Sequence, residues 1–204
     1  MQRPSTLWWF VAIVLIVPFS IWGGVRFYQS RFQTLPILGE SGHVIDDFHL
    51  QNQMGHTISR RDWDDKIVVA HYFFTHCPSI CPKMMYQLKR VQAYAAIPNV
   101  TIASFTVDPE HDSVGRLKAY AAKYELENDW NLLTGDKKIL YRLARKSFMV
   151  TATDGDGGPD DFIHSEKLVL IDTQKRIRGF YNGTDEADVS QLIKDLQKLA
   201  EETR

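Results

Sequence analysis

The pattern of apolar and polar positions predicts a single mixed α/β domain behind an apolar N-terminal segment. Continuous apolar runs, rich in β-branched and aromatic residues, cover 66–74 and 99–107 and predict two buried strands. Apolar residues at helical spacing predict helices over 81–96 and over the last part of the chain. The remaining pattern gives strand-like pieces at 43–52 and up to residue 58, helices at 113–126 and 137–146, a strand at 130–133, and a hairpin of 167–172 with 176–181. Strands and helices that alternate in this order predict a central mixed sheet flanked by helices.

The N-terminal segment differs from the rest because Leu7 to Val25 contains nineteen residues without a charge. A helix of that length crosses a hydrocarbon core of roughly 30 Å, and tryptophans lie near both ends, as in membrane helices. A cleaved signal peptide is the alternative, but no small-residue cleavage site follows the segment. The expected organisation is a flank at 1–6, a single transmembrane anchor at 7–25, a tether at 26–42 and one folded domain at 43–204.

Charge and composition narrow the classes of partner. The chain has 204 residues, with 24 basic against 25 acidic side chains and a net charge of -1, so nucleic acid is not an expected partner. No Arg-rich, acid-poor presequence precedes the anchor. We therefore expect a bacterial protein held in the cytoplasmic membrane by one helix, with its soluble domain on the periplasmic or extracytoplasmic side.

The chain has two cysteines, Cys77 and Cys81, which directly follow the predicted strand at 66–74. Pro82 fits an early helical position, so Cys77 is expected in the loop and Cys81 at the helix start, where thiolates are stabilised. A structural disulfide would close only a short loop and stabilise the fold little. Two interpretations remain, a thiol–disulfide exchange pair or two soft ligands for a metal such as Cu(I) or zinc.

A third metal ligand would have to be a histidine, because the chain has no further cysteine. His76 is too close to Cys77 to share its metal without an awkward bend, and His71 lies in an apolar run typical of the core. His164 directly precedes the predicted strand at 167–172, and in a thioredoxin-like fold the loop before that strand faces the dithiol. Three ligands open to a partner fit Cu(I) better than structural zinc, which requires four.

Several stretches of the domain share the sequence pattern of a known family. They are Phe73–Pro82, Thr106–Asp112, Trp130–Gly135, and His164–Ser165 with Leu168–Asp172 and Gly179–Thr184. On these stretches the chain resembles the Sco/SenC family of membrane-anchored, thioredoxin-like copper proteins. The resemblance covers nearly the whole predicted domain and implies a thioredoxin-like fold.

The resemblance implies that Cys77, Cys81 and His164 are the copper ligands. The expected ion is Cu(I), and Cu(II) is left open as an alternative. It further implies acids near the site, carried over to Asp108 and Asp112.

Two positions depart from the family's pattern. His111 stands where the family often has arginine, and Ile163 precedes His164 where the family usually has aspartate. The sequence thus leaves open which acid forms a hydrogen bond with the His164 imidazole. Asp160 and Asp161 are close to it in the chain.

The function implied by the resemblance is a metallochaperone that delivers copper to the dinuclear copper centre of cytochrome c oxidase. Its expected partners are the copper-accepting subunit of the oxidase and a thiol reductant. Two alternatives stay open. One is a thiol–disulfide reductase that uses Cys77 and Cys81 to keep partner cysteines reduced, and the other is a copper or redox sensor. Thiol–disulfide exchange is the one enzymatic activity that the residues suggest.

Overall fold

The computed structural model describes residues 6–32, 34–94, 99–127, 129–151, 158 and 163–202. It contains two compact units, Met1–Thr34 and Leu35–Arg204. The first unit holds the helix α1 (Thr6–Phe32), which includes Pro18 and continues past residue 26, where the tether was expected to begin. Over the described residues, no helix combines the length and the apolar character that a membrane crossing requires. The predicted transmembrane anchor is therefore not confirmed.

The second unit is built on a mixed sheet, which in the described part of the chain has seven strands in the order β2-β1-β5-β4-β3-β6-β7. Their bounds are β1 (His49–Asn52), β2 (Thr57–Ser59), β3 (Ile67–Phe73), β4 (Val100–Thr106), β5 (Trp130–Thr134), β6 (Lys167–Ile171) and β7 (Ile177–Asn182). β3, β4 and β5 run parallel, whereas the other neighbouring pairs are antiparallel. Every position of β3 and β4 is buried, as expected for parallel strands covered on both faces.

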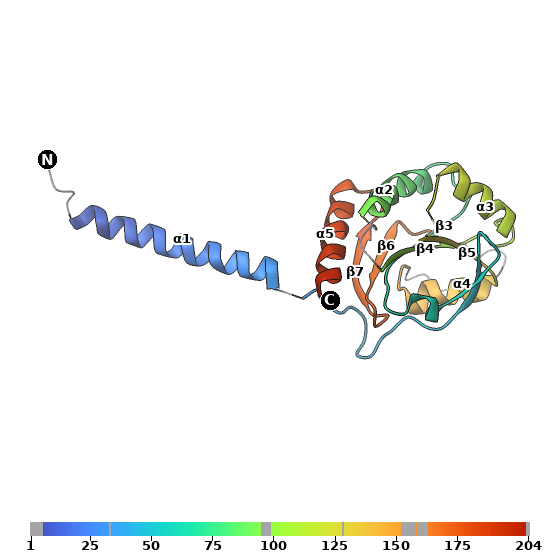
Figure 1. Cartoon of the computed structure of the whole chain (residues 1–204), viewed down its shortest axis with the longest axis horizontal. Helices are drawn as coiled ribbons and strands as arrows, with labels where there is room; N and C mark the ends of the chain where they lie inside the picture. Colours follow the sequence, from blue (N-terminus) through green and yellow to red (C-terminus); the bar gives the residue numbers. More distant parts are fainter. Residues whose placement is uncertain are drawn as a thin grey trace. The chain divides into compact units, whose positions relative to one another are not determined.

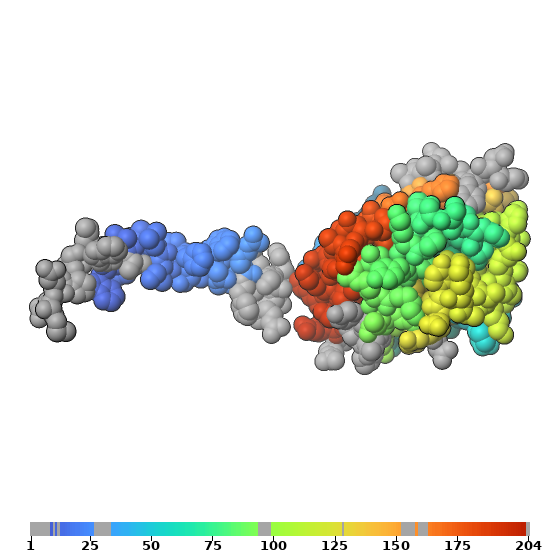
Figure 2. All heavy atoms as spheres, turned by 90° about the horizontal axis from the view of Figure 1, so that it is seen from above, coloured from blue at the N-terminus to red at the C-terminus, as the bar shows by residue number. Residues whose placement is uncertain are grey.

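Helices cover both faces of this sheet (Figure 1). One face carries α2 (Ile80–Tyr94), α3 (Val114–Lys123) and α5 (Glu186–Glu202), whose surfaces adjoin in Figure 2. The other face carries α4 (Lys137–Arg142), the π-helical turn η2 (Leu143–Ser147) and the short 3-10 helix η1 (Arg60–Trp63). Each face has its own buried apolar cluster, so the mixed sheet flanked by helices that the sequence predicts is confirmed.

The N-terminal part of the second unit packs on the domain through a buried arginine. Arg178 on β7 is 5% exposed. Its Nη2 donates to Leu35 O at 2.6 Å and to Glu202 Oε2 at 2.9 Å, and its Nε donates to Pro36 O at 3.1 Å. Glu202 Oε1 in turn accepts from Leu35 N at 3.0 Å. The compact unit therefore begins at Leu35, earlier than the residue 43 expected from the sequence.

Candidate functional site

The cysteine loop connects the central strand β3 to helix α2. β3 ends at Phe73 and α2 begins at Ile80, so Cys77 lies in the loop and Cys81 in the first helical turn. Pro82 is tolerated in that turn because the first N–H groups of a helix have no intrahelical partner. Both cysteines are free thiols. The local structure that the prolines predict for this stretch is thus confirmed.

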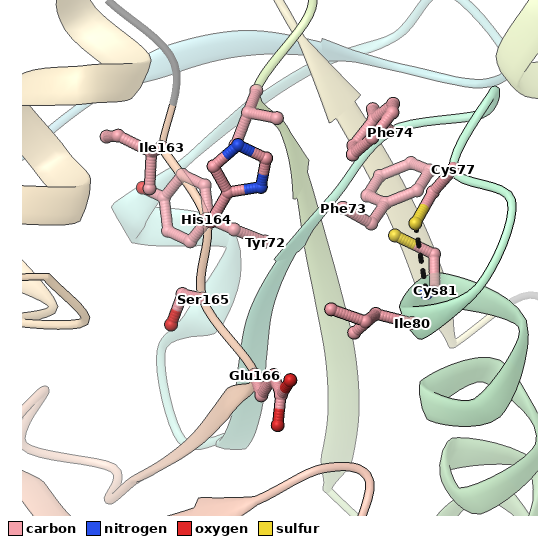
Figure 3. Close-up of a pocket in the computed structure, with 11 residues that line it drawn as sticks. Tyr72, Phe73, Phe74, Cys77, Ile80, Cys81, Ile163, His164, Ser165 and Glu166 are labelled. Carbon is pink, nitrogen blue, oxygen red and sulfur yellow. Dashed lines mark hydrogen bonds between the residues drawn. The ribbon is translucent and has the colours of Figure 1, made fainter.

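Both cysteines line a cavity of about 170 Å³ between the cysteine loop and the segment that leads into β6. Aromatic and aliphatic side chains supply most of its wall: Tyr72, Phe73, Phe74, Ile80, Val107 and Ile163. His164, Ser165 and Glu166 complete the lining on the side of β6. Figure 3 shows the sulfur atoms on one side of the cavity and the His164 imidazole on a separate segment across it. The structure therefore brings the three predicted ligands to one cavity.

The two thiols have opposite environments. Cys81 is only 5% exposed, and this burial is the main cause that raises the pKa of its thiol to about 12. Cys77 is half-buried. Burial opposes its ionisation, but N–H groups at the start of α2 outweigh this effect and lower the pKa of the Cys77 thiol. One of these donors is Cys81 N, which lies 3.3 Å from Cys77 Sγ. Cys77 therefore ionises more readily than Cys81.

His164 lines the cavity without completing a metal cluster. Its side chain is exposed. Among the described residues, no group of three or more His, Cys, Asp or Glu side chains lies close enough to hold a metal ion. Cys77, Cys81 and His164 thus line one cavity in an open arrangement.

Asp112 lies beneath the cysteine loop and is fully buried. Its carboxylate accepts hydrogen bonds from the Thr75 backbone N at 3.2 Å and from the hydroxyls of Thr75 and Thr106. Thr75 is two residues before Cys77, so the buried carboxylate holds the start of the cysteine loop against the end of β4. These bonds connect Asp112 to the loop that carries the cysteines.

Asp108 lies closer to the surface than Asp112. Its Oδ1 is 2.8 Å from Nδ1 of His111, an exposed residue, and this hydrogen bond raises the pKa of the His111 imidazole. Asp108 N donates to Thr106 Oγ1 at 2.9 Å. Asp160 and Asp161, the acids considered as partners of His164, lie outside the described residues.

Other residues with copper-binding chemistry belong to the core. Met84 and Met85 lie on α2, are 1% and 0% exposed, and belong to the buried cluster on that face of the sheet. His71 is 1% exposed, with Nε2 2.6 Å from Ser104 Oγ. The prediction that His71 is a core residue is confirmed.

Sequence reasoning missed Ser165 and Glu166 in the lining. Glu166 Oε2 accepts from Thr184 Oγ1 at 3.1 Å, and Ser165 Oγ donates to Val150 O at 3.2 Å. Their position in the chain could have indicated this, because Ser165 and Glu166 are the two residues after His164.

A dithiol at the junction of a central strand and a helix, in a mixed sheet covered on both faces, defines a thioredoxin-like thiol protein. The model of the SCO1/SenC family matches residues 38–201. The chain belongs to the SCO1/SenC family.

Relatives of the chain come from bacteria and from mitochondria. The SCO1 protein homolog of Bacillus subtilis is 32% identical over 162 residues, which cover 78% of this chain and 83% of the relative. The mitochondrial SCO2 homolog of Danio rerio is 31% identical over 67% of this chain. The match spans 50% of that longer mitochondrial protein.

Solved structures of Sco proteins have the same fold. A SCO1/SenC family lipoprotein from Bacillus anthracis has a TM-score of 0.68 at 28% identity, over 78% of this chain and 95% of that one. BsSco, described with a disulfide switch and as a member of the Sco family of cytochrome c oxidase assembly proteins, has a TM-score of 0.68 at 28% identity, over 83% and 98%. The copper-bound ScoI of Bradyrhizobium japonicum is 22% identical, with a TM-score of 0.62 over 76% and 99%, and supports the fold alone. The predicted thioredoxin-like fold is thereby confirmed.

Proposed function

We propose that this protein is a copper chaperone that carries copper on Cys77, Cys81 and His164 and delivers it to the dinuclear copper centre of cytochrome c oxidase. The observation that carries the proposal is the shared cavity, which two thiols and an imidazole line from separate segments. Family membership supports it, because Sco relatives are described as oxidase assembly proteins and as copper-bound.

The donor set suits Cu(I) as a cargo. Two thiolates and one imidazole are soft and intermediate ligands that match Cu(I), whereas a closed zinc site requires a fourth ligand. Cys77 ionises most readily because α2 supplies N–H donors to its sulfur. The metal would therefore meet Cys77 first, then displace the proton of the buried Cys81, and finally draw in His164.

The open arrangement suits release as well as capture. His164 is exposed and lies across the cavity from the sulfurs, so it can leave the metal without unfolding the sheet. A partner's ligands can then replace it before the two thiolates let go. Asp112 and Asp108 support this exchange from the loops beside β4, where Asp112 fixes the start of the cysteine loop.

The expected setting is the outer side of a bacterial cytoplasmic membrane. We propose that residues 7–25, which lie within α1, anchor the chain as one transmembrane helix. The proposed partners are the copper-accepting subunit of the oxidase and a thiol reductant, since an oxidised Cys77–Cys81 pair cannot bind Cu(I).

Deletion of the gene tests this function in the cell. We expect loss of oxidase activity with a copper-deficient oxidase, and partial recovery when copper is added to the medium. A deletion strain with a normal oxidase copper centre at low copper would contradict the proposal.

Thiol–disulfide exchange is a second candidate function, favoured by the unequal thiols. The Cys77 thiolate would attack a partner disulfide and release one partner thiolate. Cys81 would then lose its proton and attack Cys77 Sγ, which leaves a Cys77–Cys81 disulfide and a second partner thiolate. The partner gains two electrons, and a thiol reductant must restore the dithiol. BsSco is described with a disulfide switch, which supports redox activity of the pair.

Two measurements on the purified full-length chain distinguish the candidates. A chaperone should retain copper stoichiometrically after purification under reducing conditions. A reductase should be active without copper and should turn over a peptide that carries the partner's two cysteines as a disulfide.

A further inference from the structure

Ser165, the residue after His164, makes two hydrogen bonds through its hydroxyl. Its Oγ donates to Val150 O at 3.2 Å and accepts from Lys167 N at 3.2 Å. The two bonds use the hydroxyl both as donor and as acceptor. Figure 3 shows the hydroxyl of Ser165 directed away from the sulfur atoms of the cysteines. The Ser165 side chain therefore forms hydrogen bonds within the fold around His164, and its hydroxyl does not face the thiols.

The partner of Ser165 is firmly held in the fold. Val150 is 4% exposed, and its N donates at 3.0 Å to the carbonyl oxygen of Ala144 in the π-helical turn η2. π-helical turns are rare in proteins, and those that occur are often found near functional sites. The hydrogen bond of Ser165 thus connects the residue next to His164 to the buried layer that contains Val150 and η2.

The residue on the other side of His164 is tied to the same layer. Ile163 is 2% exposed and belongs to the buried cluster that contains Val150 and the side chains of α4. His164 is thus flanked by one residue anchored through apolar packing and one anchored through a hydrogen bond. With both neighbours fixed, the position of the His164 backbone at the cavity wall is fixed as well.

We propose that Ser165 is a positioning residue for copper binding, whose hydrogen bond to Val150 O holds His164 opposite the two thiols. The proposal rests on the proposed function, in which His164 is a copper ligand. A metal-ligating side chain that is not held in place must be ordered when the metal binds. The apparent copper affinity is then the intrinsic affinity multiplied by the fraction of molecules in which the side chain is in place. One hydrogen bond of ordinary net strength corresponds to a weakening of about twofold to tenfold.

A double-mutant cycle on the full-length chain tests this role. Cu(I) affinity is measured by competition with a chromophoric Cu(I) chelator under reducing conditions for wild type, Ser165→Ala, His164→Ala and the double variant. We expect Ser165→Ala to weaken binding about fivefold in wild type and to add no weakening to His164→Ala, because the serine acts through the imidazole. Ser165→Thr, which keeps the hydroxyl, should stay within about twofold of wild type.

A matched control removes a hydroxyl far from the cavity. Ser59, the last residue of the edge strand β2, donates from Oγ to Asp62 Oδ2 at 2.8 Å. Ser59→Ala should leave the copper affinity unchanged. Electron paramagnetic resonance of the Cu(II)-loaded variants gives an independent signature, since Ser165→Ala should show a weaker or more heterogeneous nitrogen coupling than wild type.

The possible failures are distinguishable. An equal loss of affinity from Ser165→Ala with and without His164 overturns the positioning role, and so does a lower Tm of Ser165→Ala with unchanged copper affinity. Unchanged affinity in His164→Ala shows that the histidine is not a ligand, which overturns the ligand set of the proposed function and the positioning role together.

Discussion

Cys77 and Cys81 should react at very different rates, because their environments change how readily each thiol ionises. Burial raises the pKa of Cys81 from its ordinary value of 9.0 to about 12, so the ionised fraction of this thiol at pH 8 falls from about one in ten to roughly one in 10⁴. N–H donors at the start of α2 instead lower the pKa of the Cys77 thiol. The ionised fraction of Cys81 is therefore about 10³-fold below that of an unperturbed cysteine, whereas that of Cys77 lies above it.

Part of this difference is offset by the intrinsic nucleophilicity of the thiolates. With a Brønsted slope of about 0.4–0.5, a thiolate whose pKa is about 3 units higher reacts roughly 15- to 30-fold faster. At pH 8 Cys81 should then react about 30- to 60-fold more slowly than an unperturbed cysteine, and Cys77 should be the faster of the two thiols. The burial of Cys81 at 5% exposure restricts access of the reagent and should increase the ratio further.

The assay is alkylation by iodoacetamide of the Cys77→Ser and Cys81→Ser variants, followed by mass spectrometry from pH 6 to pH 11. The Cys81→Ser variant should react fast at pH 8, whereas the Cys77→Ser variant should react slowly and should still accelerate above pH 10. In denaturant the two variants should react alike, which serves as the control. Equal rates in the folded proteins, or faster reaction of Cys81 at pH 8, would refute the argument.

Three further substitutions test other parts of the structure. Burial lowers the pKa of His71 from 6.5 to about 4. As the pH falls, the imidazole is therefore protonated in the unfolded state before it is protonated in the folded state. The free energy of unfolding should therefore fall by about 3 kcal/mol between pH 6.5 and pH 4. Urea titrations at a series of pH values should show a smaller fall for His71→Leu than for wild type. An equal fall in both proteins would contradict this prediction. Asp112→Asn weakens the hold of the buried carboxylate on Thr75 and should lower the free energy of unfolding by about 1–3 kcal/mol, measured by urea titration; an unchanged midpoint would count against it. Arg178→Met leaves the buried Asp172 carboxylate without one of its cationic partners and should lower the free energy of unfolding by about 3 kcal/mol. Unfolding is followed by circular dichroism, and a loss below about 1 kcal/mol would argue against a stabilising role of the ion pair.

The sequence predicts those elements whose signal is local. The apolar runs of β3 and β4 and the helical spacing after Cys81 were sufficient to predict the central layer and the place of the cysteine loop. The placement of His164 near the cysteines was predicted because, in a thioredoxin-like fold, the loop before this strand faces the dithiol.

Features that depend on distant partners were not predicted. The segment that begins at Leu35 was interpreted as a tether because it has little periodicity, and its packing relies on Arg178 and Glu202 far along the chain. The π-helical turn after α4 was predicted as a continuous helix, since helical spacing does not distinguish the two. The proposed role of Ser165 likewise depends on Val150, whose carbonyl group is brought close only by the fold.

The most direct test of the account is the Cu(I) affinity of the reduced full-length chain, measured by competition with a chromophoric chelator. Wild type should bind one Cu(I) tightly. Cys77→Ala and Cys81→Ala should each abolish tight binding, because a single thiolate with one imidazole does not complete the ligand set, and His164→Ala should weaken it strongly. Tight binding that survives the loss of either cysteine, or an unchanged affinity in His164→Ala, would contradict the proposed copper site.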